Sequence, residues 1–379
     1  MKTIFSRGLM IISIMVVLVS CGKSTGRTLT SATGSIYECL VVMNEEPLTQ
    51  DQLHTVAKLS LVNEASGYTE PVTTTFDLVE AIMAADMPCM PQVEPYFRLT
   101  QVSTAQFDDM FKPTRNILFV DINPQKYTQL KTKVSNDFWS TPQAICRIQT
   151  PSQEEFVSYW LEHGTEIRDW FVNQEIKRQM KFYRASTNKE ARAILQQQGY
   201  DMLIPEDYMV IMDTVLCGAT TYSLRNPITV APAVRLLWCC NNKGTMRRDI
   251  VVYSYPYTDN NTFTLDYLNA KRDAILSRVV SASVDGSYMG TEYKVFPPQM
   301  RAITVQEDEY ATEVRGLWKI REGEAMGGPY VSHTRLDQVN GRVVTAETFL
   351  YAAGQKKRSA LRQAEAILYT LQLPQDTIK

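Results

Sequence analysis

Two regions of alternating strand-like and helix-like pattern follow a short apolar start at residues 9–19. Short apolar runs predict strands, and apolar residues spaced at three and four predict helices. In the first region, the predicted strands are 35–43, 96–102, 116–122 and 143–148, and the predicted helices are 73–85, 107–111, a short one opening at Asn123-Pro124, and one from about 150 to 184.

The second region is richer in strands. Its predicted strands are 207–217, 234–240, 249–257, 310–321, 330–336 and 342–351, and its predicted helices are 185–198, 263–280 and 355–371. Asn340-Gly341 between the last two strands favours a hairpin turn, because both residues tolerate positive φ. The pattern therefore predicts an α+β protein of two lobes, 35–184 and 185–379, each a mainly antiparallel sheet covered by long amphipathic helices.

The apolar start is typical of a secretory signal peptide. Lys2 and Arg7 precede an apolar run of eleven residues, whereas a helix needs about 20 to cross a bilayer. The run ends in Leu18-Val19-Ser20-Cys21, which resembles the lipobox of bacterial lipoproteins. That resemblance implies a signal peptide over 1–20, a lipidated tether over 21–34, and membrane attachment through acyl chains on Cys21. An ordinary signal peptide with an incidental cysteine is the alternative.

The residues after Cys21 bear on the location of the protein. They contain no acidic cluster. In lipoproteins of Bacteroidota such a cluster marks export to the cell surface. We therefore expect an outer-membrane protein that faces the periplasm.

Composition narrows the class of protein further. The 379 residues hold 39 Lys+Arg and 41 Asp+Glu, and loss of the signal peptide lowers the net charge from −2 to −4. This balance argues against a nucleic-acid partner, because phosphate contacts need a basic excess. A hydrophobic fraction of 44% argues against a mostly disordered chain.

Six cysteines remain beyond Cys21. We expect mostly buried free thiols, because most of them lie in apolar, strand-like runs, although an even number permits up to three disulfides. Cys239 and Cys240 are adjacent in a predicted strand, so they should point to opposite faces. The six are Cys39, Cys89, Cys146, Cys217, Cys239 and Cys240.

Several segments resemble a known family. They include Arg315-Gly316-Leu317-Trp318, Met326-Gly327-Gly328-Pro329-Tyr330, Gly286-Ser287-Tyr288-Met289, Lys357-Arg358-Ser359-Ala360-Leu361-Arg362, Arg115-Asn116-Ile117-Leu118 and Tyr253-Ser254-Tyr255-Pro256-Tyr257. The resemblance is to Bacteroidota lipoproteins catalogued only as a domain of unknown function, and it covers essentially the whole mature chain. It implies a lipid-anchored envelope protein and brings no activity, cofactor or catalytic residue.

Catalytic and metal motifs are weak in this sequence. Ser186–Lys189 has the S-x-x-K spacing without its companion motifs, and Ser287 follows Gly286 directly, unlike the G-x-S-x-G elbow. The three histidines are scattered outside any ligand motif. We predict no catalytic residue, no cofactor and no metal.

The best candidate for ligand binding is the segment from Arg315 to Tyr330. Gly327 and Gly328, with Pro329, predict a tight connection whose N–H groups could hold an anion, with Arg315 and Trp318 contacting an anionic or glycan ligand. The alternative is a turn whose glycines meet a backbone requirement, with Trp318 in the core.

Two further groups of residues are candidates. A basic cluster opens the last predicted helix, where cations oppose the helix dipole, and it predicts an anion or partner patch, with solvation and pairing to Glu365 as the alternative. Its members are Lys356, Lys357, Arg358 and Arg362. Tyr253, Tyr255 and Tyr257 alternate onto one strand face, where they could stack on sugars or pack beneath a helix.

The sequence therefore predicts a non-enzymatic binding or assembly module anchored in the cell envelope. An envelope protein or a glycan is the expected partner. The alternatives are a periplasmic serine hydrolase that uses Ser287 or another serine with His333, and a glycan-binding lipoprotein that uses Tyr255.

Overall fold

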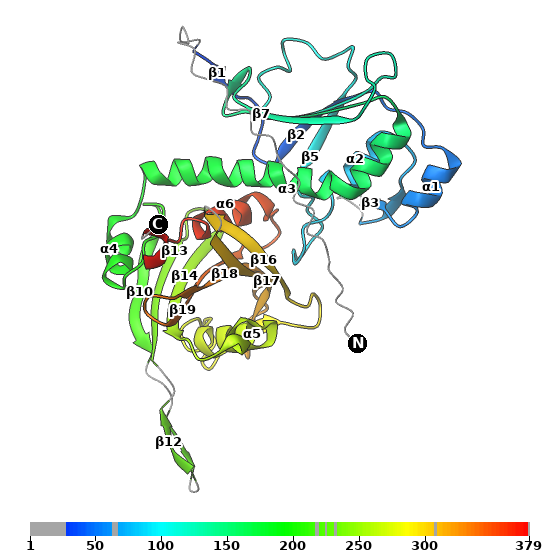
Figure 1. The fold of residues 1–379 in the computed structure, drawn as a ribbon. Helices are drawn as coiled ribbons and strands as arrows, with labels where there is room; N and C mark the ends of the chain where they lie inside the picture. The colour runs from blue at the N-terminus through cyan, green and yellow to red at the C-terminus, as the bar shows by residue number, and fades with distance from the viewer. Residues whose placement is uncertain are drawn as a thin grey trace, which may run out of the picture.

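The computed structural model describes residues 28–62, 67–216, 220–223, 226–230, 233–306 and 309–377. The predicted signal peptide, Cys21, the start of the tether and Cys217 lie outside these residues. Two domains, each a sheet with helices, lie on either side of one long helix (Figure 1). The predicted α+β class is confirmed.

The N-terminal domain is built on a five-stranded sheet of order β5-β2-β6-β9-β7. Its strands are β2 (Glu38–Met43), β5 (Arg98–Val102), β6 (Asn116–Ile122), β7 (Lys131–Asn136) and β9 (Ala144–Thr150). Three pairings are parallel, and the pairing of β7 with β9 is antiparallel.

The prediction of a mainly antiparallel sheet is therefore wrong for this domain. Parallel neighbours need crossover connections of a dozen or more residues, and the segment 44–97 provides one between β2 and β5. The signal was present in β2, where the continuous apolar run Cys39–Met43 is typical of a strand buried on both faces.

Shorter elements complete this domain. They are β1 (Thr30–Ser31), α1 (Gln50–Val56), β3 (Ser60–Val62), β4 (Thr69–Pro71), α2 (Thr75–Met83) and β8 (Ser140–Thr141). The helices predicted at 107–111 and after Asn123 are turns. The Asn123 side chain accepts the N–H groups of Gln125 and Lys126, which closes a local turn instead of opening a helix.

The long helix α3 (Gln153–Ala185) connects the two domains. Ser152 caps it by accepting the Glu155 N–H, and the helix begins within a few residues of the predicted start at about 150. Its first half packs with α2 on one face of the N-terminal sheet, and a Cβ at Gly164 would lie 3.0 Å from the Ile82 side chain. Its second half contacts the C-terminal domain, where the Tyr183 hydroxyl donates to the Gln363 carbonyl at 2.9 Å.

The C-terminal domain holds one curved antiparallel sheet of order β10-β13-β14-β19-β18-β17-β15, with β16 paired to β17 (Figure 1). All of its pairings are antiparallel, as predicted for this lobe. The strands are β10 (Met209–Leu216), β13 (Val234–Asn241), β14 (Arg247–Pro256), β15 (Tyr288–Glu292), β16 (Gln299–Gln306), β17 (Glu309–Arg321), β18 (Gly327–Asp337) and β19 (Arg342–Tyr351).

Helices cover both faces of this sheet. On one face lies α5 (Leu265–Leu276), and on the other lie α6 (Arg358–Leu368) and the end of α3 (Figure 1). The remaining elements are α4 (Lys189–Gln197), the hairpin of β11 (Thr220–Ser223) and β12 (Asn226–Val230), and the 3₁₀ turns Asn260–Phe263 and Pro374–Thr377.

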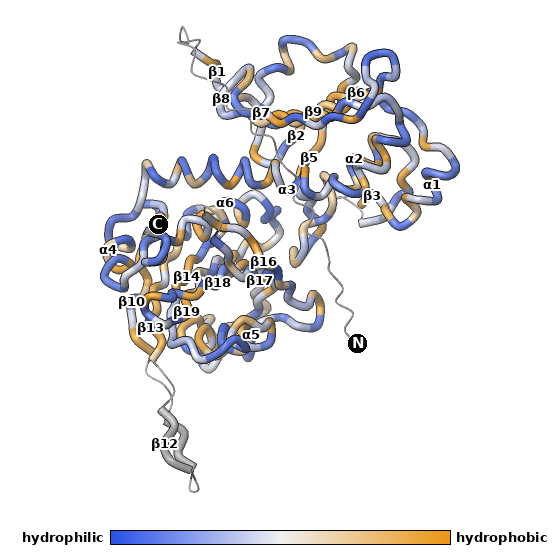
Figure 2. Tube along the Cα trace, viewed as in Figure 1, coloured by the Kyte–Doolittle hydropathy of each residue, from blue (hydrophilic) through white to orange (hydrophobic). Residues whose placement is uncertain are grey.

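The largest hydrophobic cluster belongs to both domains. It includes Phe97 and Phe171 from the N-terminal side and Leu361 and Ile367 from α6. Apolar residues follow the strands of both sheets in Figure 2. Because apolar side chains of the two domains share one core, their interface is part of the folded interior.

Gly327 and Gly328 lie inside β18, opposite Lys319 and Trp318 of β17, so the predicted tight anion-binding connection is wrong at this position. A Cβ at Gly328 would stand 2.0 Å from the Leu350 carbonyl oxygen. The alternative is wrong in placing these glycines in a turn, but the backbone requirement that it named is confirmed. The reason is a close approach of the neighbouring strand rather than a positive φ.

The Gly328→Ala variant should therefore lower the free energy of unfolding by about 3 kcal/mol, because the sheet must shift to admit the Cβ. Urea unfolding measures the change. The control Met300→Ala, on the exposed part of β16, should change it by less than about 1 kcal/mol. A wild-type unfolding midpoint for Gly328→Ala would contradict the close approach.

Candidate functional site

Arg315 and Trp318 lie on opposite faces of β17. Trp318 packs against Phe349 at 5.7 Å between ring centroids, and its Nε1 donates to the Leu350 carbonyl at 3.0 Å. Arg315 points to the other face, where it meets α6. Residues three apart in a strand cannot share a face. The predicted joint ligand site is therefore wrong, and Trp318 is a core residue, as the alternative held.

The Arg315 face carries a buried ion cluster. Arg315 donates to Glu313 through Nε at 2.8 Å and Nη2 at 3.0 Å, and Nη2 also donates to Glu365 of α6. Arg362 donates to the same Glu365 at 3.1 Å, and Arg301 of β16 donates to Glu313 at 2.6 Å. We call these five side chains the interdomain ion cluster.

The charges of this cluster stabilise one another. Burial alone would raise the pKa of Glu313, but the charge of Arg315, with His333 and Arg301 nearby, holds it well below its usual range. Burial opposes the charged form of Arg315, yet Glu313 and Glu365 raise its pKa well above the ordinary value. The groups are thus ionised together, and removal of one would leave a buried charge unpaired.

The two carboxylates of the cluster, together with the neighbouring His333, also have the chemistry of metal ligands. The donor atoms of Glu313, His333 and Glu365 lie within 4.8 Å of one another. Both carboxylates, however, are already occupied by guanidinium groups, and Arg315 lies between them. His333 Nε2 is 3.5 Å from Glu313, and its ring packs edge-on against Tyr369. The arrangement fits an ion-pair network and does not fit a cation site.

A cavity of about 210 Å³ lies beside the cluster, between the two domains. Arg301 and Arg362 form one side of it, and Tyr96, Asp169 and Asn173 of the N-terminal domain form the other. The Arg301 side chain is 46% exposed and uses its Nε for Glu313, and Arg362 Nε has no hydrogen-bond partner among the described residues. Two guanidinium groups and one carboxylate, that of Asp169, line the cavity, so its charge favours an anion.

The predicted basic patch is mostly internal. Lys357, Arg358 and Arg362 are buried, and of the four residues Lys356 alone is exposed. The anion at the start of α6 belongs to the chain itself, because the Glu94 carboxylate accepts the backbone N–H groups of Lys357 and Arg358 at 2.7 to 2.9 Å. This carboxylate accepts hydrogen bonds from N–H groups at the start of the helix that have no partner within the helix. Its negative charge also interacts favourably with the positive end of the helix dipole. The prediction of an open anion or partner patch is wrong.

Ser287 and His333 do not meet. Ser287 Oγ accepts the Ala282 N–H at 2.9 Å and precedes Tyr288, which pairs with Arg321. His333 pairs with Glu313, eight residues away along the same strand, which corresponds to about 26 Å. The two side chains cannot form a nucleophile and base pair.

The tyrosine row lies in the core. Tyr253 and Tyr255 are each 3% exposed and pack beneath α5, where Lys271 Nζ lies 4.8 Å from the Tyr255 ring centre. The alternative of packing beneath a helix is confirmed for these two residues. Tyr255 is not available to stack on a sugar.

The described cysteines are buried free thiols, as expected. Cys239 belongs to the interdomain core, while Cys240 points to the opposite face beside Asp249. Burial raises the pKa of both thiols to about 12. They stay protonated near neutral pH and are poor nucleophiles.

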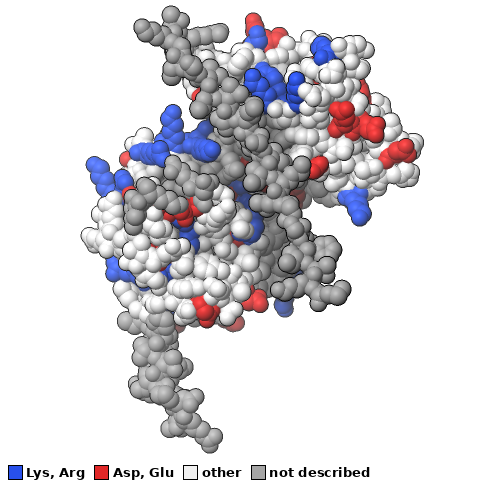
Figure 3. Space-filling model, in the orientation of Figure 1, with Lys and Arg blue, Asp and Glu red and all other residues white. Residues whose placement is uncertain are grey.

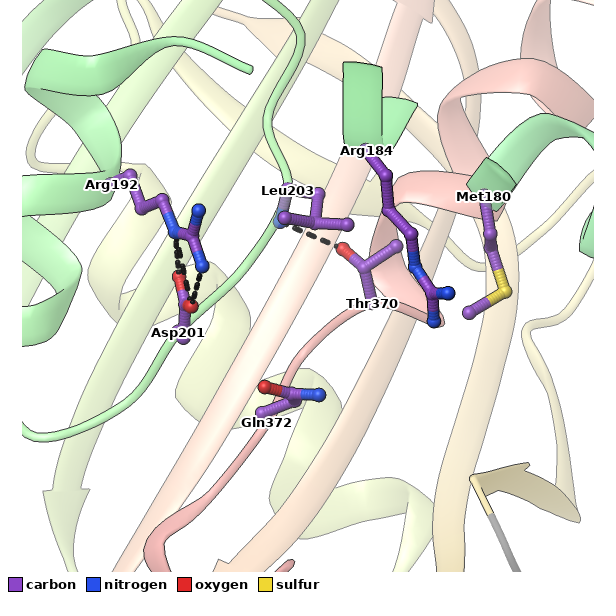
Figure 4. Close-up of a pocket in the computed structure, with 7 residues that line it drawn as sticks. All are labelled: Met180, Arg184, Arg192, Asp201, Leu203, Thr370 and Gln372. Carbon is purple, nitrogen blue, oxygen red and sulfur yellow. Dashed lines mark hydrogen bonds and ion pairs between the residues drawn. The ribbon is translucent and has the colours of Figure 1, made fainter. Parts of the chain in front are cut away.

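A second cavity, of about 290 Å³, lies where the end of α3 meets the C-terminal segment (Figure 4). Arg192 forms a bidentate pair with Asp201, and the Leu203 N–H donates to Thr370 at 2.9 Å. Arg184 extends from α3 toward Thr370 in this view. Arg192 is already paired with Asp201, so Arg184 is the cation that this cavity offers. Two arginines line the interdomain cavity, which is therefore the stronger candidate.

Sequence reasoning missed Arg301, Glu313, Tyr96 and Asp169. One signal was available: Glu313 and Arg315 are alternate residues of an apolar strand, so two opposite charges share one of its faces. Charged residues are rarely buried unless they are paired. The partner residues Arg301 and Tyr96 carry no local signal, since they come from separate elements.

The Glu365→Gln variant should lower the free energy of unfolding by about 3–5 kcal/mol, because it leaves Arg315 and Arg362 buried with too little negative charge. Chemical unfolding followed by circular dichroism measures this. Asp109→Asn, which removes the acid of the exposed Lys112–Asp109 pair, should leave the free energy of unfolding nearly unchanged. Equal losses in the two variants would refute a structural role for the cluster.

Comparison with known proteins divides the chain at the end of α3. Residues 53–184 match the family model described as Domain of unknown function (DUF8532), and residues 186–370 match Domain of unknown function (DUF4837). No curated protein matches the chain. The two matched regions are neighbours along the chain, and both models describe domains of unknown function, as the motifs of the chain indicated.

Proposed function

We propose that this chain is a lipid-anchored envelope protein, held in the outer membrane by acyl chains on Cys21 and facing the periplasm. The observation that carries the proposal is the apolar run at 9–19 followed by Leu18-Val19-Ser20-Cys21. Several acyl chains give durable attachment, whereas one gives marginal binding. Among the described residues, no helix has the length and apolar character needed to span a bilayer.

We further propose that the protein binds a ligand rather than transforming one. Support comes from the interdomain cavity, where Arg301 and Arg362 present guanidinium groups to an enclosed space between the domains. Sites of small ligands are concave and often lie at domain interfaces. The separation of Ser287 from His333 supports binding over a hydrolase that would pair these two residues.

The ligand class follows from the chemistry of the cavity. Guanidinium groups recognise carboxylate and phosphate oxygens through paired N–H donors. Asp169 on the opposite wall is already engaged by Arg168 at 2.9 Å, so it does not cancel the charge of Arg301. A small anionic ligand is therefore the class that we propose.

Replacement of Cys21 tests the anchor. In cells of a lipoprotein-processing bacterium, Cys21→Ala should abolish incorporation of labelled palmitate and move the protein out of the membrane fraction, because the acylated thiol is lost. Cys240→Ala, which removes a buried thiol of the C-terminal domain, should keep both properties. Palmitate labelling that persists in Cys21→Ala would refute the proposal.

Replacement of Arg301 tests the cavity. Inorganic phosphate at about ten times its Kd should stabilise the wild-type protein by about 1.4 kcal/mol, seen as a rise in Tm. Arg301→Gln should lose this rise, because the exposed guanidinium is gone, while Lys177→Gln on the exposed side of α3 should retain it. A rise of the same size in Arg301→Gln would exclude the cavity as the anion site.

A further inference from the structure

The face of the N-terminal sheet that points away from α2, α3 and the C-terminal domain carries a group of aromatic rings (Figure 1). Phe119 lies on β6, Phe107 and Phe111 lie in the loop 103–114, and Phe138 and Trp139 immediately precede β8. Phe107 lies 4.9 Å from Phe119 and 5.7 Å from Trp139 between ring centroids. We call these five residues the aromatic face.

The aromatic face is partly open to solvent. The Phe138 side chain is 54% exposed, and Met110, in the same loop as Phe107, is 72% exposed. Beneath them are the buried Ile117 and Ile145 of the sheet. In the interior of a two-layer domain such rings would be covered by a helix, but here loops alone pack on this side among the described residues.

Cations lie among and beside the rings. The Arg147 guanidinium is 4.8 Å from the Phe119 ring centre, 5.2 Å from Trp139 and 5.3 Å from Phe138. Lys133 stands opposite Arg147 in the β7–β9 register, and Lys131 stands opposite Gln149, so both lysines share its face. Figure 3 shows basic side chains on the N-terminal domain near β7.

These three cations form no ion pair with a described residue. The nearby acids are otherwise engaged. Asp109 pairs with Lys112 and Asp121 pairs with Lys126, while Asp108 and Asp137 accept backbone N–H groups of their own loops. The cations Lys131, Lys133 and Arg147 are therefore available to an external anionic surface.

The start of the described chain lies at this face. Thr30 of β1 pairs with Ser140 of β8, the residue directly after Trp139. Cys21 precedes Thr28 by seven residues, which can span at most about 25 Å. Acyl chains on Cys21 would therefore hold Thr28, which just precedes the β1 segment at this face, within about 25 Å of the bilayer surface.

We propose that the aromatic face docks on the headgroup layer of an anionic phospholipid bilayer, with Trp139 and Phe138 inserted and with Lys131, Lys133 and Arg147 at the phosphates. Aromatic side chains favour the membrane interface, and clustered cations favour anionic lipid. This inference rests on the proposed acylation of Cys21, which sets the distance, and it adds the orientation of the protein on the membrane.

The test uses the acylated chain reconstituted in vesicles of phosphatidylcholine and phosphatidylglycerol that carry brominated acyl chains. Bromine quenches tryptophans that lie at the bilayer, so part of the emission of the five tryptophans should be lost. Trp139→Phe should remove the quenched part, and vesicles without phosphatidylglycerol should lower it. Quenching that is absent, or unchanged in Trp139→Phe, would overturn the proposal.

A matched pair of double variants distinguishes the effect of charge on the aromatic face from the effect of the net charge of the protein. Lys131→Glu with Lys133→Glu should reduce the quenching several-fold, whereas Lys177→Glu with Lys181→Glu, the same charge change on exposed residues of α3, should leave it. Equal loss in the two double variants would overturn the proposal, because attraction would then depend on net charge and not on this face.

The anchor and the docking face can fail separately. Flotation with the vesicles reports the anchor, and bromine quenching reports the face, so flotation without quenching overturns the docking alone. If the chain is not acylated, Cys21→Ala carrying a histidine tag in place of the signal peptide can be held on nickel-chelating lipid, and quenching is measured again. Absence of quenching there, with polysaccharide retention lost in Phe138→Ser, would assign the face to a glycan.

Discussion

The structure depends on the buried contact of Arg315 with Glu313 and Glu365. It ties the middle of the C-terminal sheet to α6, and through Arg362 it reaches the rings of Tyr37 and Tyr96 at 5.7 and 5.0 Å in the N-terminal domain. Charges buried this deeply are costly unless each has a partner. The position of α6, and with it the interface between the domains, is therefore restricted to the arrangement that gives each of these charges an opposite partner.

The same principle recurs in the rest of the chain. Glu175 of α3 is fully buried and accepts from Arg115 and Arg178, which holds the long helix on the N-terminal sheet. On the other face of the C-terminal sheet, Arg272 of α5 pairs with the buried Glu347. Each pair fixes one helix to one sheet, so buried charge specifies how the layers are placed, while the apolar cores provide the driving force for burial.

Local sequence predicts the helices and strands of the chain better than it predicts the residues of the candidate site. The strand predicted at 116–122 is β6 as observed, and the helices predicted at 73–85 and 263–280 contain α2 and α5. Hydrophobic periodicity reports which face of an element is buried, and that information is local. The short helices expected at 107–111 and after Asn123 are turns in the structure. After Asn123, the Asn123 side chain accepts two backbone N–H groups and so closes a local turn.

By itself the sequence determined the positions of the major elements and the α+β class, and it predicts an acyl anchor at Cys21. The tertiary structure decided what each buried face meets: Arg315 was visible as a candidate, but its partner Glu365 is fifty residues away and Arg301 lies on another strand. It also decided that β2, β5, β6 and β9 run parallel. The physical reason is that strand direction and ion pairing depend on contacts between distant segments. Local hydrophobic periodicity carries no information about such contacts.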